Sequence, residues 1–261
     1  MIRAALTIAG SDPSGGAGIQ ADLKTFHQRG VYGMGVITLL TVQNTRRLSQ
    51  VSLLTPKMVL AQLDAVLEDL PCHAAKTGAL GNAAIVSAVA RRAASFSFPL
   101  VVDPVMVSKK GRALLDKQAC QLLKKRLLPH TTLVTPNFDE AHALSGVEVR
   151  DLETMEKAAK AISRFGPEAV LVKGGGLKKE AVDLLYYRGK IRFFSSRRVE
   201  TTHTHGTGCV YSAAITAELA KGKDLLEAIQ VAKEFIHLAI QTNPGLGQGV
   251  GPLNLLAAVQ L

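Results

Sequence analysis

Short apolar runs rich in β-branched residues alternate along the chain with longer stretches that carry apolar residues at helical spacing. Helices are expected in those longer stretches, for example at residues 19–28, 82–94 and 116–127, with another beginning near Pro56 because proline suits a helix's first turn. The apolar runs predict strands at residues 6–9, 36–40, 73–76, 100–103, 133–135 and 170–173. Such alternation is typical of an α/β fold with a mostly parallel sheet covered on both faces.

The C-terminal third of the chain departs from this alternation. Residues 184–187 and 191–194 flank a short turn at Gly189 and predict a β-hairpin. Two helices are expected after it, near residues 208–220 and 225–241. No repeat or low-complexity segment divides the 261 residues, so we expect one domain over residues 1–261.

The chain is basic, with a formal net charge of +10. Its basic residues are scattered doublets with few aromatic residues between them, so a surface on which nucleic-acid bases stack is not indicated. We therefore expect a solvated surface that attracts small anions, and no nucleic-acid partner. The doublets are Arg46-Arg47, Arg91-Arg92, Lys109-Lys110, Lys178-Lys179 and Arg197-Arg198.

The cysteines and the N-terminus point to the cytoplasm. Cys72, Cys120 and Cys209 are widely spaced and form no CxxC pair, so neither a disulfide framework nor a zinc site is indicated. That usage suits a reducing compartment. The apolar stretch 4–9 is too short for a signal peptide, and the stretch 31–42 is too short for a membrane span.

A glycine-rich loop at residues 10–18 follows the first predicted strand. It lacks the Gly-Lys-Ser/Thr of a Walker A loop. Residues 16–21 fit GxGxxA, but no acidic residue ends the second predicted strand, which disfavours an NAD-dependent oxidoreductase. The loop is either a turn that needs positive φ angles or backbone that approaches a ligand, and its length favours the ligand.

A second glycine-rich segment, Gly206-Thr207-Gly208-Cys209, precedes a predicted helix. Unpaired N–H groups at a helix N-terminus bind anions, and a cysteine there is expected to ionise more readily than a free thiol. The alternative is a buried structural cysteine at a glycine-capped helix start. His203 and His205 lie close by without a third metal ligand in range, and we interpret them as loop histidines.

Charged residues follow three neighbouring predicted strands, where parallel sheets bind ligands. Asp103 ends one strand, Glu140 follows the next, and Lys173 ends a third. A few carboxylates with water hold Mg²⁺ against phosphates. Glu140 could equally complement a helix dipole, and Lys173 could simply end its strand. Asp103 at a buried strand end requires a partner.

These segments together resemble the hydroxymethylpyrimidine/phosphomethylpyrimidine kinase family of the ribokinase-like superfamily. The resemblance runs over nearly the whole chain. In chain order, its motifs are AGSDPSGGAGIQAD at 9–22, Gln43-Asn44-Thr45, Lys76-Thr77-Gly78, Asp103-Pro104-Val105-Met106, Thr135-Pro136-Asn137 with Glu140, Lys173-Gly174-Gly175 and His205-Gly206-Thr207-Gly208-Cys209.

The resemblance implies a three-layer α/β/α sandwich and ATP-dependent phosphorylation of an aminopyrimidine and its monophosphate in thiamine biosynthesis. It also implies Mg²⁺ and a homodimer. Cys209 would be the catalytic base, assisted by Gly206, Thr207 and Gly208. The other implied contacts are substrate binding by Gln43, Asp22, Gly10 and Val105, ATP binding by Lys173 and Asn137, and metal binding by Asp103 and Glu140.

Three positions depart from the family's pattern. Ala79 replaces a usual Met, His203 replaces a common Asn, and the usual His after Asn254 is absent. Ala79 bears on substrate preference, because a smaller side chain enlarges or reshapes a pocket. The nearest alternative is a pyridoxal kinase of the same fold. A non-enzymatic nucleic-acid binder would show steep salt dependence and no need for Cys209.

Overall fold

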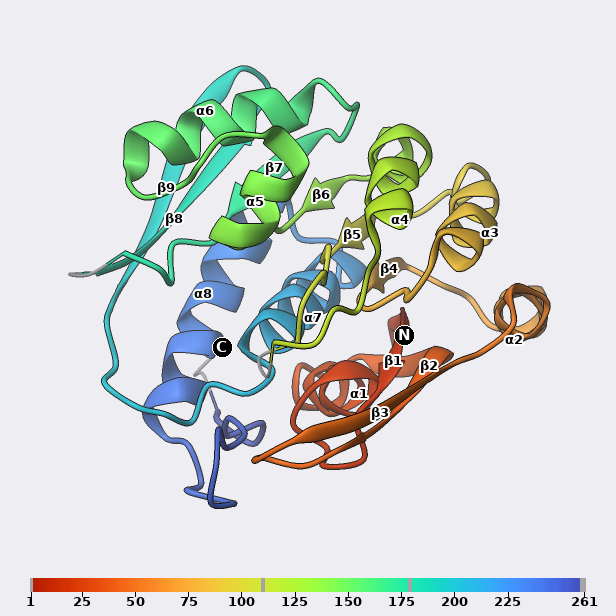
Figure 1. The fold of residues 1–261 in the computed structure, drawn as a ribbon, viewed down its shortest axis with the longest axis horizontal. Coiled ribbons are helices and arrows are strands. Elements are labelled where there is room, and N and C mark those ends of the chain that lie inside the picture. The colour runs from red at the N-terminus through yellow and green to blue at the C-terminus, as the bar shows by residue number, and fades with distance from the viewer. Residues whose placement is uncertain (1, 109–110, 178–179, 259–261) are drawn as a thin grey trace.

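A computed structural model describes residues 2–108, 111–177 and 180–258 (Figure 1). The doublets Lys109-Lys110 and Lys178-Lys179 lie outside the described residues. The strands are β1 (Ala4–Ser11), β2 (Tyr32–Gln43), β3 (Leu48–Leu53), β4 (Ala74–Thr77), β5 (Leu100–Val102), β6 (Leu133–Val134), β7 (Ala169–Val172), β8 (Glu180–Tyr187) and β9 (Lys190–Arg197). The helices are α1 (Gly18–Gln28), α2 (Pro56–Asp69), α3 (Ala83–Ala93), α4 (Lys117–Leu122), α5 (Phe138–Ser145), α6 (Leu152–Ser163), α7 (Thr207–Ala220) and α8 (Leu225–Gln241).

The strands form one sheet in the order β3-β2-β1-β4-β5-β6-β7-β8-β9. All neighbours from β2 to β7 pair in parallel, whereas β3 at one edge and β8 and β9 at the other pair antiparallel. The predicted mostly parallel sheet is therefore confirmed, and so is the hairpin, which is β8–β9.

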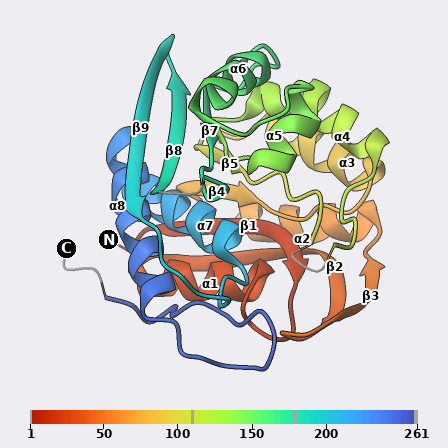
Figure 2. The same cartoon turned by 60° about the vertical axis from the view of Figure 1, so that its left-hand side comes forward.

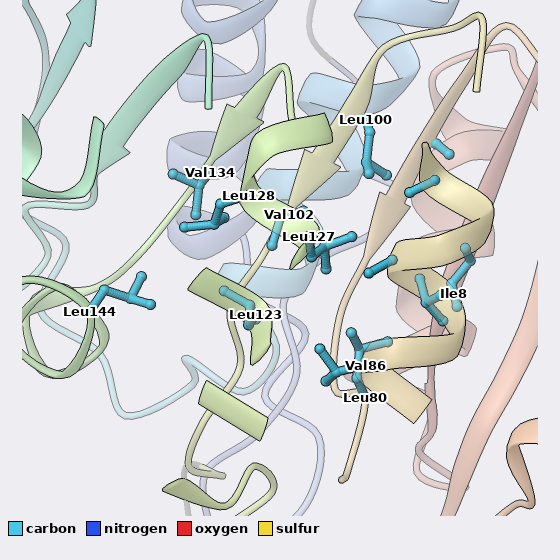
Figure 3. Close-up of a cluster of buried hydrophobic side chains, with 14 of the residues drawn as sticks. Ile8, Leu80, Val86, Leu100, Val102, Leu123, Leu127, Leu128, Val134 and Leu144 are labelled. Carbon is cyan, nitrogen blue, oxygen red and sulfur yellow. The ribbon is translucent and has the colours of Figure 1, made fainter. Parts of the chain in front are cut away.

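Helices cover both faces of the sheet (Figure 2), as α2 to α6 pack on one side and α1, α7 and α8 on the other. Successive side chains of strand β1 point to opposite faces of the sheet. Leu6 and Ile8 belong to the core cluster on one face, and Ala5 belongs to the cluster on the other. Figure 3 shows the first cluster, in which Ile8, Val102 and Val134 meet side chains from the covering helices. Burial on both faces explains why these strands are continuous apolar runs.

Two local features differ from the sequence prediction. Strand β3 was not expected, because Ser49, Gln50 and Ser52 are polar and exposed at the sheet edge and interrupt any apolar run. The helix predicted at 116–127 is α4 followed by a π-helical turn at Leu123–Leu127. Among residues 2–108, 111–177 and 180–258, no helix has the length and apolar character that crossing a membrane requires.

Candidate active site

A cavity of about 550 Å³ opens at the carboxyl ends of the parallel strands. Gly10 at the end of β1, Gln43 at the end of β2 and Asp103 just after β5 line it. Glu140 and Cys209 join them from the first turns of α5 and α7. The candidate residues that the sequence places at separate strand ends therefore lie around one space, as expected for a parallel sheet.

A second cavity of about 440 Å³ adjoins the first. Asn137, Asp139, Lys173, Thr207 and Gly208 line both cavities. These shared residues form a common wall, so two ligands could lie side by side with their ends meeting at it. The second cavity is completed by residues from β8, β9, α7, α8 and the segment after β9, among them Asp183, Val199, Tyr211, Lys233, Ile236 and His237.

The N-terminus of α7 places backbone N–H groups at the common wall. Gly206 is its N-cap with φ 80°, and no side chain caps the helix. A Cβ on Gly206 would lie 1.9 Å from the carbonyl oxygen of Gly16, so the glycine-rich loop packs directly against this helix start. Among the first-turn N–H groups of α7, that of Thr207 donates to the Thr204 carbonyl oxygen at 3.4 Å, and a helix N-terminus of this kind favours a nearby anion.

Asp103 and Lys173 form an ion pair beneath that helix start. Lys173 Nζ donates to Asp103 Oδ1 at 2.8 Å, which gives Asp103 the partner that its burial requires. Burial on its own would lower the pKa of Lys173, but Asp103 and then Glu140 raise it overall, so the side chain is a permanent cation. A Cβ on Gly208 would lie 3.2 Å from Lys173 Nζ, so this charge reaches the amides of α7.

Glu140 combines a local structural contact with an unusual ionisation. Its Oε2 accepts from the Asn137 backbone N–H at 2.8 Å while Asn137 Oδ1 accepts from the Glu140 N–H at 2.9 Å, which is a capping box. Burial nevertheless raises the pKa of Glu140 to about 7, with Asp103 adding to the rise. The Lys173 ammonium lowers this pKa in part, so burial is the main cause of the rise.

Cys209 does not ionise as its helix position predicts. Burial raises the pKa of the thiol to about 12, although the Lys76 ammonium lowers it in part. The expected readily formed thiolate is therefore contradicted, because desolvation of the negative charge outweighs the helix start. Cys72 and Cys120 are also free thiols and pack partly buried against the core, as expected.

Asp22 lies behind the cavity and does not line it. Its fully buried carboxylate accepts from Lys76 Nζ at 2.7 Å and from Thr7 Oγ1 at 2.6 Å, which corrects the expectation of direct substrate contact. Burial on its own would lower the pKa of Lys76, but Asp22 raises it overall. Lys76 Nζ also donates to the Cys209 carbonyl oxygen at 3.2 Å, so the ion pair supports the first turn of α7.

The end of the first cavity away from the common wall is lined by small and uncharged side chains. Gln43 Nε2 donates to Thr41 Oγ1 at 2.9 Å, and both side chains face the cavity. Gly10 is required by packing, since a Cβ there would lie 2.5 Å from Leu39 Cδ1. Ala79 and Val105 complete this end, so an apolar ring with a polar edge would fit it.

Sequence reasoning missed the polar groups of the second cavity. Asp183 Oδ1 accepts from the Gly174 backbone N–H at 2.8 Å, and its Oδ2 accepts from Lys233 Nζ at 2.7 Å. Asp183 thereby holds the loop after Lys173 in place. The available signal was weak: a lone Asp in a strand and a lone Lys on the inner side of α8 become a buried pair only when the sheet and helix meet.

Comparison with known proteins gives a consistent result. A family model described as phosphomethylpyrimidine kinase matches residues 12–254. A hydroxymethylpyrimidine/phosphomethylpyrimidine kinase from Synechococcus elongatus is 45% identical over 251 residues, covering 95% of both chains.

Solved structures agree. A Bacillus subtilis pyridoxal kinase in an ADP complex has a TM-score of 0.92 and 42% identity, covering 98% of each chain. A phosphomethylpyrimidine kinase from Clostridium difficile has a TM-score of 0.81 and 41% identity, covering 92% of this chain and 100% of that one.

Proposed function

Because this chain belongs to the phosphomethylpyrimidine kinase family, we propose that it transfers the γ-phosphoryl group of ATP to an aminopyrimidine. Its fold is ribokinase-like, as the sequence predicts. The acceptors are 4-amino-5-hydroxymethyl-2-methylpyrimidine and its monophosphate, in thiamine biosynthesis. One observation carries the proposal: two cavities meet at a wall that holds a helix N-terminus and Lys173. The kinase domain spans residues 1–261.

The acceptor occupies the first cavity. Gln43 offers a donor and an acceptor to the ring edge, Val105 packs against its face, and the Gly10 backbone approaches it closely. The hydroxymethyl group then points to Cys209 and the amides of α7. Asp22 contributes indirectly, by holding Lys76 under that helix turn.

The nucleotide occupies the second cavity and presents its phosphates at the common wall. Lys173 and Asn137 line both cavities and would contact the phosphates. The N–H groups of Gly206, Thr207 and Gly208 would receive the negative charge of the transferring phosphoryl. Glycine at 208 leaves room for the two charged groups beside it, since a Cβ there would lie 3.2 Å from Lys173 Nζ and 3.4 Å from Asp103 Oδ2.

Asp103 and Glu140 fit a magnesium site. Within the described residues, no group of three or more His, Cys, Asp or Glu side chains could hold a metal ion, but Mg²⁺ is usually held by one or two carboxylates with water and substrate phosphates. Burial is the main cause of the raised pKa of Glu140, and a bound cation would favour the ionised form of this carboxyl. When bound, Mg²⁺ supplies positive charge that stabilises the phosphates during transfer.

Cys209 is the proposed base for the hydroxymethyl proton. Since burial raises its pKa to about 12, the thiol is protonated at neutral pH, and the thiolate must form during turnover. Phosphoryl transfer depends mainly on positioning and electrostatics. The amides of Gly206 to Gly208 and Lys173 therefore provide catalysis even before Cys209 accepts a proton.

We also propose a cytoplasmic homodimer without nucleic-acid or membrane partners. Leu40 and Val42 of β2 are 46% and 55% exposed, and they alternate with Leu39, Thr41 and Gln43, which line the cavity. They thus form an apolar outer face beside the edge strand β3, which a second copy would cover. Val42→Lys should convert the dimer to monomer in light scattering, and a monomeric wild type would refute the interface.

A pyridoxal kinase is the second candidate. The Bacillus subtilis pyridoxal kinase overlaps this chain closely, and Ala79 leaves room at the ring end of the cavity. Pyridoxal carries a hydroxymethyl group on a ring of similar size, so the common wall would serve it equally.

Substrate-dependent ADP formation separates the candidates. The enzyme is assayed with the aminopyrimidine, its monophosphate and pyridoxal, with Asp103→Asn as the control for contaminating kinases. Turnover of the first two compounds at higher kcat/KM than pyridoxal is expected. A preference for pyridoxal would favour the second candidate, and no turnover of any of them would refute both.

A further inference from the structure

Asp12 is the polar centre of the glycine-rich loop. Its side chain is almost fully buried, and its Oδ1 accepts from the Ser14 backbone N–H at 2.9 Å and from Ser14 Oγ at 2.7 Å. Its Oδ2 accepts from the Ala17 N–H at 2.9 Å and lies 2.8 Å from His205 Nε2. The carboxylate thus joins both ends of the loop to a residue far along the chain.

His205 is the residue directly before Gly206, and it is only 5% exposed. Because a carboxylate only accepts hydrogen bonds, Nε2 must carry the proton. The backbone N–H of His205 donates to the Gly251 carbonyl oxygen at 3.0 Å, and a Cβ on Gly16 would lie 2.7 Å from the imidazole Cδ2. The ring is therefore enclosed between the glycine-rich loop and the C-terminal segment.

The two contacts act on the same short stretch of backbone. Asp12 fixes the loop that contains Gly16, and the Gly16 carbonyl oxygen packs against Gly206. The contact with Asp12 fixes His205, the residue directly before Gly206, and Gly206 has a left-handed backbone at φ 80°. The direction of the first N–H groups of α7 depends on that conformation.

The ionised carboxylate of Asp12 favours its hydrogen bond with His205. Burial on its own would raise the pKa of Asp12, but the hydrogen bonds from His205 and then Ser14 lower it overall. The carboxylate is therefore ionised in the working range of the enzyme. Lys24 of α1 donates to the neighbouring Gly15 carbonyl oxygen and not to Asp12, so His205 is the titratable group in contact with it.

We propose that Asp12 and His205 form a positioning pair that aims the N–H groups of Gly206 to Gly208 at the transferring phosphoryl. The inference rests on the proposed kinase function and deepens it. His205 also lines the first cavity, but in this proposal its role is to hold the donors, so its loss should affect the transition state more than the bound substrates. Loss of one oxyanion donor typically costs about 10²–10³-fold in kcat.

The test compares three substitutions at one position. His205→Leu removes the donor, His205→Asn retains a smaller polar group that falls short of Asp12, and His205→Gln places an N–H at a reach similar to Nε2. We expect His205→Leu and His205→Asn to lower kcat about 10–10³-fold, with KM for ATP and for the pyrimidine changed less than about threefold. His205→Gln should recover at least tenfold of the loss.

His73→Leu is the matched control. His73 Nδ1 accepts from the Ala4 backbone N–H at 3.1 Å, at the opposite end of β1 from the cavity. Its loss should lower the melting temperature without changing kcat. If His205→Leu does not fold, His205→Asn provides the same comparison.

The outcomes separate this inference from the proposed function. Wild-type turnover together with an unchanged kcat in His205→Asn would overturn the positioning pair and leave the kinase assignment intact. Equal losses in His205→Gln and His205→Leu would also overturn it, because packing of the ring would then matter and not its donor. Absence of turnover in the wild type would instead refute the proposed function.

Discussion

The ionisation of Cys209 gives the sharpest prediction. Burial raises its pKa from 9.0 to about 12, so the thiolate fraction at neutral pH is about 10³-fold smaller than for an ordinary thiol. Because the thiolate is the nucleophile, alkylation by iodoacetamide should be slowed by about that factor. Its rate should rise about tenfold per pH unit up to pH ~10 without a plateau. Mass spectrometry of the labelled peptides measures this, with Cys72, whose pKa burial also raises to about 12, as an internal comparison.

A plateau in the Cys209 alkylation rate between pH 7 and about 9 would refute the burial argument, because it would reveal a thiolate already formed. The catalytic role is tested separately. Cys209→Ala should lower kcat by about 10²–10⁴-fold if the thiol is the base, with ATP affinity retained. Cys209→Asp should keep more activity than Cys209→Ala, since a carboxylate ionises readily. Wild-type turnover in Cys209→Ala would leave the α7 amides as the source of catalysis.

Three further predictions follow from the buried polar groups. Lys76→Met should lower the unfolding free energy by about 3–5 kcal/mol, because it leaves the buried Asp22 carboxylate without its counter-ion. Urea denaturation should show recovery when Asp22→Asn is added, and equal stability of the single and double variants would contradict the pairing. Burial raises the pKa of Glu140 from 4.5 to about 7, so the folded state binds the extra proton and the unfolding free energy should fall as pH rises across that window. In thermal melts, Glu140→Gln should make the stability less dependent on pH. The same substitution should raise the Mg²⁺ concentration needed for turnover. An unchanged pH dependence would argue against the raised pKa of Glu140, and an unchanged Mg²⁺ requirement would argue against its role in metal binding. Gln43→Leu should raise KM for the pyrimidine about 5–150-fold and spare KM for ATP, and equal loss of both would indicate misfolding.

The sequence predicts those parts of the site that depend on short segments. The segment from Gly206 to Gly208 predicts a helix start without a side-chain cap, and α7 begins there. Asp103 and Lys173 end strands, and the parallel order of β5, β6 and β7 brings them within 2.8 Å. Periodicity and turn chemistry are sufficient for the helix start and for each strand end, because each is decided within a few residues of the chain. The Asp103–Lys173 ion pair itself depends on the order of the strands in the sheet.

Contacts between distant segments could not be predicted. In the sequence, Asp22 resembles an acid that binds a ligand, but in the fold it pairs with Lys76. The family resemblance alone does not show whether a residue touches the substrate or holds another residue in place. Asp12 and His205 are 193 residues apart. The pKa of Cys209 depends on how fully the fold excludes water, and local sequence carries no measure of that.

The common wall between the two cavities has a kinetic consequence. With the reactants in adjoining spaces of about 550 and 440 Å³, the phosphoryl group can pass directly from donor to acceptor, and no carrier on the protein is required. Such an enzyme forms a ternary complex before it reacts. Double-reciprocal plots at several fixed ATP concentrations should therefore intersect, whereas a ping-pong enzyme gives parallel lines. Inversion of configuration at a chirally labelled phosphorus would record the same single displacement in the product itself.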